Sequence, residues 1–506
     1  GRLMNNSHVI PRTHLQKEPA GQGNRGKSIF VVLVAALCAT GCASMHNLKP
    51  QARLGDIDDL ASAKSLRGVP RSESAWPTTD WWTRFNDPQL DRLVQEALSG
   101  NPSLKAAQAR VRKALALAGV AGAARFPQIE GRGTISEQRF SERGVVPPPF
   151  AGHWSSENRL AVNLSYDLDF WGRNRSAYES ALDQAKAAAV DAYAARLFIS
   201  ASVAHAYVEL QHAYNQLDVA NETLKQRQHI LDLTRDRVAA GLDTRLELKQ
   251  AESALPATRE QIAALNETIQ LTQNQLAALL GQGPDRGLVI ARPQPQELGA
   301  VALPTNLPAD LIGRRPDVIA QRWRVQASSK DIDVAKAEFY PNINLTAFVG
   351  LESLGLGKFL ETSSGVVGVG PAVSLPIFTG GRLTSNLSEK NADFDIAVEQ
   401  YNETLVNALR EVVDQLDSFR SVDEQRQQLQ IALSAAQDAY DLSLLRYQGG
   451  VGNYLQVLSA ESQVLAQKGL ATDLNARELD LSINLIRALG GGYDVRASAP
   501  TLGSLK

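Results

Sequence analysis

Several segments of the chain alternate between apolar and polar residues with a period of two. The clearest has one wholly apolar face, made of Leu160, Val162, Leu164, Tyr166, Leu168 and Phe170. Further alternating segments lie at 342–351 and 365–377, and a weaker one covers 128–137. Strands of about ten residues with one apolar face are typical of tilted strands in transmembrane β-barrels. We therefore predict two strands at about 127–170 and two at about 341–378. The face of a soluble β-sandwich fits any one strand, but not strands placed between long helices.

Long helical segments separate the two strand pairs. A helical pattern without proline runs over 173–240 and again over 382–448. At 1.5 Å per residue each helix would be roughly 100 Å long, far beyond a usual globular helix. Return helices follow at 242–280 and 451–489, and helices of about 25 residues precede the strand pairs, at 102–125 and 316–339. Each half can thus build one continuous rod and one rod of two stacked helices. A filamentous coiled coil is the alternative, but a sustained a/d heptad is absent.

The chain repeats itself once. Arg237-x-x-x-Gly241 recurs 209 residues later as Arg446-x-x-x-Gly450, and Phe126-Pro127-x-Ile129 recurs 214 residues later as Tyr340-Pro341-x-Ile343. A duplication of this size indicates one supersecondary unit used twice. The expected divisions are a signal peptide with a lipobox (1–41), a lipidated linker (42–80), repeat 1 (81–282), a linker (283–306), repeat 2 (307–492) and a tail (493–506).

Four strands cannot close a barrel, because about eight are needed before side chains can fill its interior. An open sheet in lipid would leave unpaired backbone groups along its edges. We therefore expect several chains to share one barrel. Three chains would supply twelve strands, and four chains with sixteen would satisfy the same rule.

The N-terminal segment has the pattern of a targeting signal. Arg25 and Lys27 precede an apolar run from Ile29 to Leu37, which is too short to span a bilayer as a helix. The run leads to Ala39-Thr40-Gly41-Cys42, which resembles a bacterial lipobox and predicts lipid attachment at Cys42. Ala43 at the second mature position, rather than Asp, favours the outer membrane. Ordinary secretory cleavage after Ala43 is the alternative.

Composition excludes several classes of function. The formal net charge is −2 and no Lys/Arg cluster is present, so nucleic-acid binding is not expected. The only cysteines are Cys38 and Cys42, and the seven histidines show no paired metal-ligand spacing. His205 and Glu209 are expected on a solvated helix face. No P-loop, nucleophile elbow, HExxH or CxxC motif occurs, so no catalytic residue, metal or cofactor is expected. Asp167 and Asp169 are predicted to line the lumen.

At these residues the chain resembles the TolC-like outer-membrane factors, most closely their NodT-type lipoprotein branch. The resemblance rests on the repeated hairpin and strand-entry motifs and on an opening signature, Trp81-Trp82-x-x-Phe85-x-Asp87-Pro88-x-Leu90. It implies an α+β membrane protein: an all-antiparallel α-helical barrel of two tandem repeats, continued by a transmembrane β-barrel that three protomers share. It also implies a homotrimer that works with a periplasmic adaptor and an inner-membrane pump.

The implied function is a passive exit duct for small molecules in a tripartite efflux system. The exit channel of a type I protein-secretion system, which uses the same family, is the alternative. A periplasmic spacer or envelope tether without a pore is a hypothesis from another class, and it would require the strands to remain in water. Ion conductance separates the last hypothesis from the first two.

The resemblance also places a gate at the periplasmic tip, near Gly241 and Gly450. Relatives close this tip with aspartate rings, whereas the matching residues here are Gln456 and Ser459. A basic residue that links neighbouring helices in those relatives corresponds to Gly452. Tyr447 matches a gate tyrosine, and Glu247 is expected as its acidic partner; ordinary packing of Tyr447 at a helix end is the alternative. Asp243 and Arg245 are expected to face the mouth or the adaptor.

Overall fold

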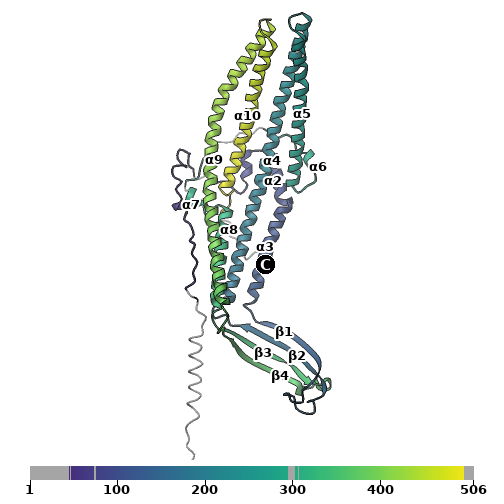
Figure 1. Cartoon of the computed structure of the whole chain (residues 1–506), viewed down its shortest axis with the longest axis vertical. Helices are drawn as coiled ribbons and strands as arrows, with labels where there is room; N and C mark the ends of the chain where they lie inside the picture. The colour runs from purple at the N-terminus through teal and green to yellow at the C-terminus, as the bar shows by residue number, and fades with distance from the viewer. Residues whose placement is uncertain (1–44, 46, 73–75, 295–301, 306, 495–506) are drawn as a thin grey trace, which may run out of the picture.

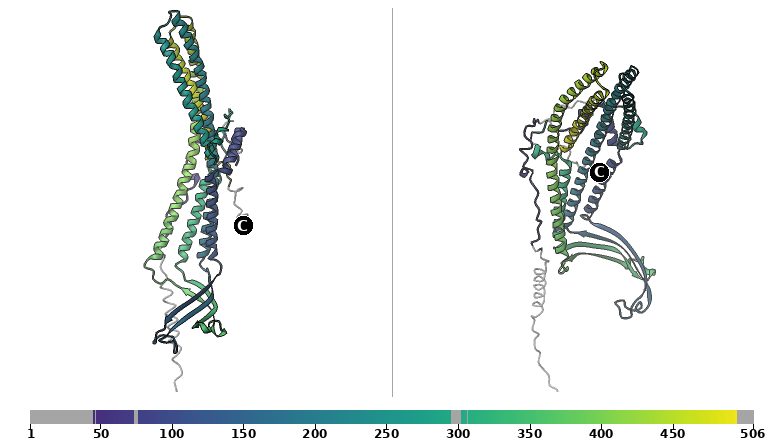
Figure 2. Two further views of the ribbon diagram at one scale, coloured as in Figure 1. Left: turned by 90° about the vertical axis from the view of Figure 1, so that its right-hand side faces the viewer. Right: turned by 45° about the horizontal axis from the view of Figure 1, so that its top comes forward.

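The computed structural model describes residues 45, 47–72, 76–294, 302–305 and 307–494. The helices run side by side in an elongated body, and a curved sheet continues from one end of it (Figure 1, Figure 2). The predicted signal segment and Cys42 lie outside the described residues.

The two halves of the chain contain matching series of elements. The first half comprises η1 (Ile57–Asp59), η3 (Trp81–Phe85), α2 (Pro88–Gly100), α3 (Pro102–Ala123), β1 (Gln128–Arg139), β2 (Trp154–Asp167), α4 (Arg173–Ala239), α5 (Arg245–Leu279) and α6 (Asp285–Leu288). The second comprises α7 (Leu307–Leu311), α8 (Pro316–Ala337), β3 (Asn342–Leu354), η4 (Leu356–Lys358), η5 (Thr362–Ser364), β4 (Gly365–Ser374), α9 (Arg382–Gln448) and α10 (Tyr454–Ala488). The long helices α4 and α9 both have 67 residues, and the return helices α5 and α10 both have 35.

Local sequence signals fix where these helices begin and end. Pro102 and Pro316 occupy the first turns of α3 and α8, where the missing N–H costs no hydrogen bond. Thr244 caps α5 in a capping box, and the Asn453 side chain accepts from the backbone of Gln456 at the start of α10. Gly241 and Gly450 follow the long helices with φ of 73° and 78°, the left-handed conformation that glycine adopts without strain.

The stacked rod predicted for each half is present. In the first half α3 and α5 meet end to end beside α4, and the Asn101 side chain donates to the carbonyl of Leu279 at 2.8 Å. At this joint a Cβ on Gly281 would lie 2.6 Å from the Gly100 carbonyl oxygen. The equivalent joint between α8 and α10 holds Gly490, where a Cβ would lie 2.0 Å from the Arg314 carbonyl oxygen. Only glycine allows the chain to pass this closely.

The four strands form one antiparallel sheet in the order β1-β2-β3-β4. The central pairing of β2 with β3 joins the two repeats and sets Leu160 opposite Leu351 and Val162 opposite Val349. Within the described chain, β1 and β4 each have a strand partner on one side only. The sheet therefore has two free edges and one apolar face, on which Val367 and Val369 are exposed.

The hydrophobic cores lie along the helices. The largest cluster packs η3 and α2 against the middle of α4, with Trp81, Val94 and Tyr207 at its centre. By length and composition α4 is the one described helix that could cross a membrane. Many of its apolar side chains, such as Val203 and Leu210, are fully buried in this cluster, so packing within the body accounts for them.

Candidate functional sites: the helical tip and the membrane wall

The end of the body farthest from the sheet, where α4 turns into α5 and α9 into α10, holds a buried polar network (Figure 1). Tyr447, in the last turn of α9, is fully buried. Its phenol O–H donates to Oδ2 of Asp243, in the turn before α5, at 2.6 Å. The hydroxyl oxygen of Thr234 on α4 lies 3.0 Å from the same phenol oxygen. The bond to Asp243 joins the two helical hairpins.

Arg237 completes this network. Its Nε donates to Asp243 at 2.8 Å, and its Nη1 donates to the backbone carbonyl of Tyr447 at 2.7 Å. The guanidinium carbon lies 4.3 Å from the centroid of the Tyr447 ring, within the range of a cation–π contact. One arginine thus holds the acid and the tyrosine together. We call Thr234, Arg237, Asp243 and Tyr447 the tip network.

The protonation states of the tip network suit its hydrogen bonds. Burial, followed by the hydrogen bond to Asp243, raises the pKa of Tyr447 to about 12. The hydrogen bond from Arg237 is the main cause that holds the pKa of Asp243 below its usual value. At neutral pH the phenol is therefore a neutral donor and the carboxylate a charged acceptor, which is a strong combination.

Two predictions about the tip are wrong. Tyr447 pairs with Asp243 rather than Glu247, because Glu247 is the third residue of α5 and accepts from the backbone N of Thr244 at 2.9 Å. Asp243 was expected to face the mouth or the adaptor, but its ion pair with Arg237 turns the side chain inward, where 9% of it is exposed.

The other predicted tip residues stay at the surface or in the turn. Arg245, Gln456 and Ser459 are exposed. Gly452 lies in the turn before α10, where its N–H donates to the carbonyl of Arg446 at 2.9 Å. A Cβ on Gly452 would approach Tyr447 N to 3.0 Å, so the tight turn accounts for glycine at this position.

Sequence reasoning gave no role to Thr234 or Arg237. A signal was present in the repeat: Arg237 and Arg446 are equivalent, but only Arg237 is followed six residues later by an acid. The equivalent of Asp243 is Gly452, and Arg446 is exposed. The network therefore exists in the first hairpin only, because the second hairpin has no acid at the position of Asp243.

Further polar pairs join α4 to α10 along the body. His205 Nδ1 lies 2.6 Å from Asp480, and His212 Nε2 lies 2.8 Å from Asp473. The solvated face expected for His205 is thus a contact between hairpins.

Nearer the tip, Arg227 pairs with the buried Glu461 at 3.3 Å and donates to the Thr258 hydroxyl at 2.9 Å. Burial raises the pKa of Glu461 above its usual value.

The sheet has an apolar face that suits contact with lipid, and we call this face the membrane wall. Leu160, Val162, Val349, Val367 and Val369 share one face and are all at least 48% exposed. Exposed aromatic residues flank this face at both ends of the strands; they are Phe126, Phe170, Trp171, Tyr340 and Phe378 near the helices and Trp154 at the far end. An apolar band between aromatic girdles is typical of transmembrane barrels.

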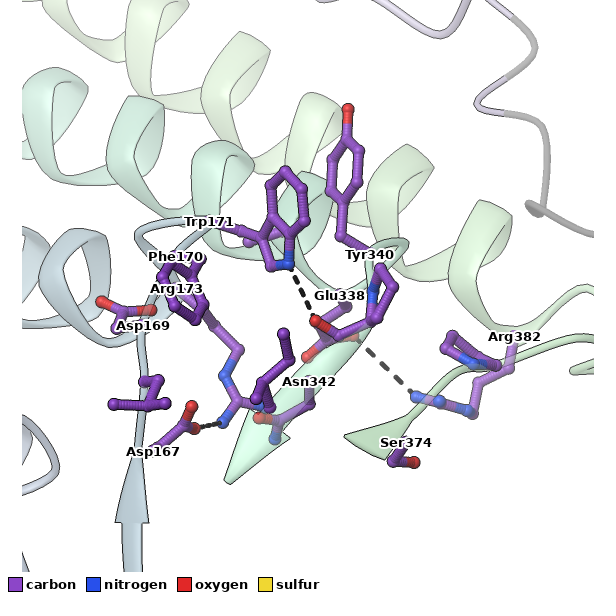
Figure 3. Close-up of a pocket in the computed structure, with 15 residues that line it drawn as sticks. Asp167, Asp169, Phe170, Trp171, Arg173, Glu338, Tyr340, Asn342, Ser374 and Arg382 are labelled. Carbon is purple, nitrogen blue, oxygen red and sulfur yellow. Dashed lines mark hydrogen bonds and ion pairs between the residues drawn. The ribbon is translucent and has the colours of Figure 1, made fainter. Parts of the chain in front are cut away.

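Where the sheet meets the helices, the chain forms a cleft of about 350 Å³ (Figure 3). Trp171 stacks on Tyr340 with ring centroids 4.6 Å apart, and its indole N–H donates to the carbonyl of Pro341 at 2.8 Å. These contacts tie the end of the first strand pair to the start of the second.

Asp167 and Asp169 fasten this junction. Asp167 pairs with Arg173 at 2.7 Å. Asp169 accepts from the backbone N–H groups of Asn174 and Arg175, at 3.1 and 2.8 Å, and so caps the start of α4. The lumen-lining role of both acids stays a prediction, and within the described chain both help to fix the start of α4.

The N-terminal segment is fastened along α9. The Asp395 carboxylate accepts from the backbone N–H groups of Gln51 and Ala52, and Asn402 Oδ1 accepts from Gly55 N at 2.7 Å. Met45 and Leu48 pack against a cluster that includes Phe339 and Leu383, at the end of the body next to the sheet. Residue 45 is therefore held close to the proposed membrane wall.

Within the described residues no group of three or more His, Cys, Asp or Glu side chains could hold a metal ion. The side-chain clusters above are hydrogen-bonded and ion-paired contacts that join the helices.

Comparison with known proteins gives this architecture a family. Residues 93–282 and 307–491 match the family described as Outer membrane efflux protein. The fusaric acid resistance protein FusA of Burkholderia cepacia is 43% identical over 375 residues, which cover 73% of this chain and 70% of FusA. The multidrug resistance outer membrane protein MdtP of Escherichia coli O6:H1 is 33% identical over 92% of this chain and 95% of its own length. The outer membrane protein VceC of Vibrio cholerae has a similar structure, with a TM-score of 0.78 and 37% identity over 83% of this chain and all of VceC.

The fold and its two sites define an outer-membrane channel with a helical periplasmic body. The chain belongs to the outer membrane efflux protein family, and it is the outer-membrane channel component of an efflux system. Its fold class is the predicted one, a helical barrel continued by a β-barrel to which each protomer contributes four strands. Proteins of this family are channels rather than enzymes.

Proposed function

We propose that three copies of this chain form one passive duct that carries small molecules across the outer membrane. The observation that carries the proposal is the sheet, which has an apolar face and free edges at β1 and β4. Pairing β4 of one copy with β1 of the next satisfies the backbone groups that lipid cannot. Three copies give twelve strands, enough for an open lumen.

The partners we infer are a periplasmic adaptor and an inner-membrane pump, which supplies the energy. The hairpin turns at the tip present apolar side chains at equivalent positions of the two repeats: Leu242 and Leu246 in the first, Val451 and Leu455 in the second. Each is more than 60% exposed, which is unfavourable in water unless another surface covers it. An adaptor that caps the tip would bury these residues, and Arg245, Gln456 and Ser459 beside them would lie at its rim.

We also propose that Cys42 carries lipid. Met45 is held at the membrane-proximal end of the body, and three residues reach at most about 11 Å. A lipid on Cys42 would therefore enter the membrane beside the wall without a long tether.

The lipid assignment has a direct test. Metabolic palmitate labelling should mark the wild-type protein and not Cys42→Ala, because the chain beyond the predicted cleavage site contains no other cysteine. The variant should still fractionate with the outer membrane, held there by the barrel. Labelling that survives the substitution would overturn the assignment.

The tip network is proposed as the lock of the closed duct, because it is the last polar link between the two hairpins before their turns. Gln456 and Ser459 carry no charge, so the mouth should lack a ring that traps cations. Planar-bilayer recording of the purified protein tests the duct itself. We expect ion conductance with weak block by trivalent cations. A protein that inserts and never conducts would contradict a duct, and strong block would reveal an acidic ring elsewhere.

A further inference from the structure

The polar face of the sheet contains two arginines around a small residue. In the pairing of β1 with β2, Arg132 lies directly opposite Ala161. Arg159 is two residues before Ala161 on β2 and therefore projects from the same face. This face is opposite to Leu160 and Val162, so it points away from lipid and into the proposed lumen. A cleft of about 520 Å³ opens here, with Glu130, Arg132, Arg159, Ala161, Asn163 and Ser165 in its lining.

An aromatic ring stands beside these arginines. Phe348 interrupts the polar side of β3, and its register partners are Asn163 on β2 and Gly368 on β4. The guanidinium carbon of Arg159 lies 5.5 Å from the centroid of the Phe348 ring. The ring occupies the space above Gly368, where a Cβ would approach it to 2.6 Å. Glycine on β4 thus makes room for an aromatic side chain in the lumen.

Both arginines keep donors for a ligand. Arg159 meets Glu352 through one nitrogen at 3.4 Å, and Arg132 meets Glu130 through one nitrogen at 3.3 Å. Each guanidinium has five N–H donors in a planar fork, which matches the two oxygens of a carboxylate. The side chains of Arg159 and Arg132 are 46% and 70% exposed, so their remaining donors are accessible from the cleft.

We propose that this cleft, the wall site, binds small aromatic carboxylates as they pass through the channel. The carboxylate would accept from Arg159 and Arg132, and the aromatic ring would lie against Phe348 and the Arg159 plane. Arginine is suited to both roles because its guanidinium forks to carboxylates and stacks on rings. The next inward position on β4 is Gly370, which has no side chain and no neighbouring atom within 4 Å of where a Cβ would lie, so open space remains beside the Phe348 ring. The inference rests on the proposed duct, since it requires this face to line a lumen.

Reversal potentials in planar bilayers test the wall site. Full-length protein would be measured under gradients of sodium benzoate and of sodium acetate. For wild type we expect benzoate to permeate more readily than acetate, relative to sodium. Arg159→Gln and Phe348→Leu should each lower the benzoate permeability ratio about three-fold, because an exposed cation–π contact has an energy of that order. Phe348→Leu should leave acetate unchanged. Lys358→Gln, in η4 beyond the end of β3, removes the same charge outside the cleft and should change neither anion.

Each outcome is decisive. A conducting protein whose benzoate ratio is unaffected by Arg159→Gln and Phe348→Leu overturns the wall site and leaves the duct intact. The wall site is also overturned if Arg159→Gln lowers the benzoate and acetate permeability ratios equally while Phe348→Leu changes neither. Arg159 would then act only as a positive charge that attracts any anion. A wild type that never conducts removes the duct and the wall site together. If a variant assembles poorly, broadening of the fluorine NMR signal of para-fluorobenzoate by wild type in detergent, absent with Arg159→Lys, decides the same question without a bilayer.

Discussion

At the scale of single residues, the proposed lock at the tip depends on one carboxylate that accepts hydrogen bonds from two partners. Asp243 accepts from Tyr447 of the second hairpin and from Arg237 of its own hairpin. Arg237 in turn donates to the Tyr447 backbone. Separating the two hairpins would break all three links to Tyr447, and Arg237 would lose the Tyr447 carbonyl while keeping Asp243. The network is therefore cooperative, and the loss of Asp243 should weaken every contact in it.

Tyr447→Phe and Asp243→Asn should raise the open probability of single channels. A hydrogen bond to a charged group contributes about 1.5–3 kcal/mol, so the closed state should lose about ten-fold or more in population. Bilayer recording measures this directly. Glu247→Gln is the matched control, because it weakens only the cap of α5 and should leave gating unchanged. A Glu247→Gln channel that opens while Asp243→Asn stays closed would reverse the assignment.

The pH dependence of the lock follows from the same residues. The pKa of Asp243 is lowered, so its contribution is present above the ordinary carboxyl value of about 3.9 and is lost as pH falls through the lower folded value. The pKa of Tyr447 is raised, so its contribution is present below about 10 and is lost as pH rises through about 12. Open probability should therefore be flat between roughly pH 5 and 9. A change in open probability within that window would contradict the assignment of the lock to Asp243 and Tyr447.

From the sequence, Tyr447 was predicted to bond to an acid in the first hairpin, but the acid chosen was the wrong one. Two carboxylates, Asp243 and Glu247, lie four residues apart in the same turn, and the spacing alone does not say which one points inward. The contacts of each acid decide which one points inward. Glu247 accepts from the backbone N of Thr244 in the helix cap, whereas Asp243 forms an ion pair with the buried Arg237. Arg132 and Arg159 of the wall site could likewise be predicted only as polar residues on strands. Whether they share one cleft depends on the register between β1, β2 and β3, which the sequence does not show.

At the scale of elements, the joints between stacked helices depend on glycine. At the joint of each stacked rod, two backbone segments lie within van der Waals contact. The close approaches are Gly281 against Gly100 and Gly490 against Arg314. Both Gly281 and Gly490 also have positive φ, so a side chain there would be strained as well as crowded.

Gly281→Ala and Gly490→Ala should lower the thermal stability of the protein, because the added methyl must displace backbone rather than a flexible side chain. Gly469→Ala is the control. Gly469 lies inside α10 with open space around its Cα, and alanine there should stabilise the helix by about 1 kcal/mol. Circular dichroism melts of the three variants provide the comparison. Equal or higher melting temperatures for the two joint variants would show that the joints are loose.

Element boundaries were the most predictable part of the fold. The long helices were expected at 173–240 and 382–448 and extend over Arg173–Ala239 and Arg382–Gln448. Glycines with positive φ mark both ends of each helix: Gly172 and Gly241 for α4, and Gly381 and Gly450 for α9. The weak alternation at 128–137 is strand β1, whose outward positions include Gly131 and Gly133 beside two isoleucines. Those glycines explain why its periodicity was faint.

At the scale of the whole molecule, one chain by itself closes neither a β-barrel nor a helical barrel. Its sheet has an apolar face and two free edges, and its helices form part of a wall rather than a closed bundle (Figure 2). The number of copies could not be predicted from strand closure alone, because twelve and sixteen strands both satisfy the backbone. The family resemblance selected three.

Native mass spectrometry of the detergent-solubilised protein tests the shared barrel most directly. We expect a particle of three chains, stable without any partner protein, because each copy supplies the strand edges that its neighbours need. A monodisperse single chain that keeps its full β-sheet signal by circular dichroism would contradict it.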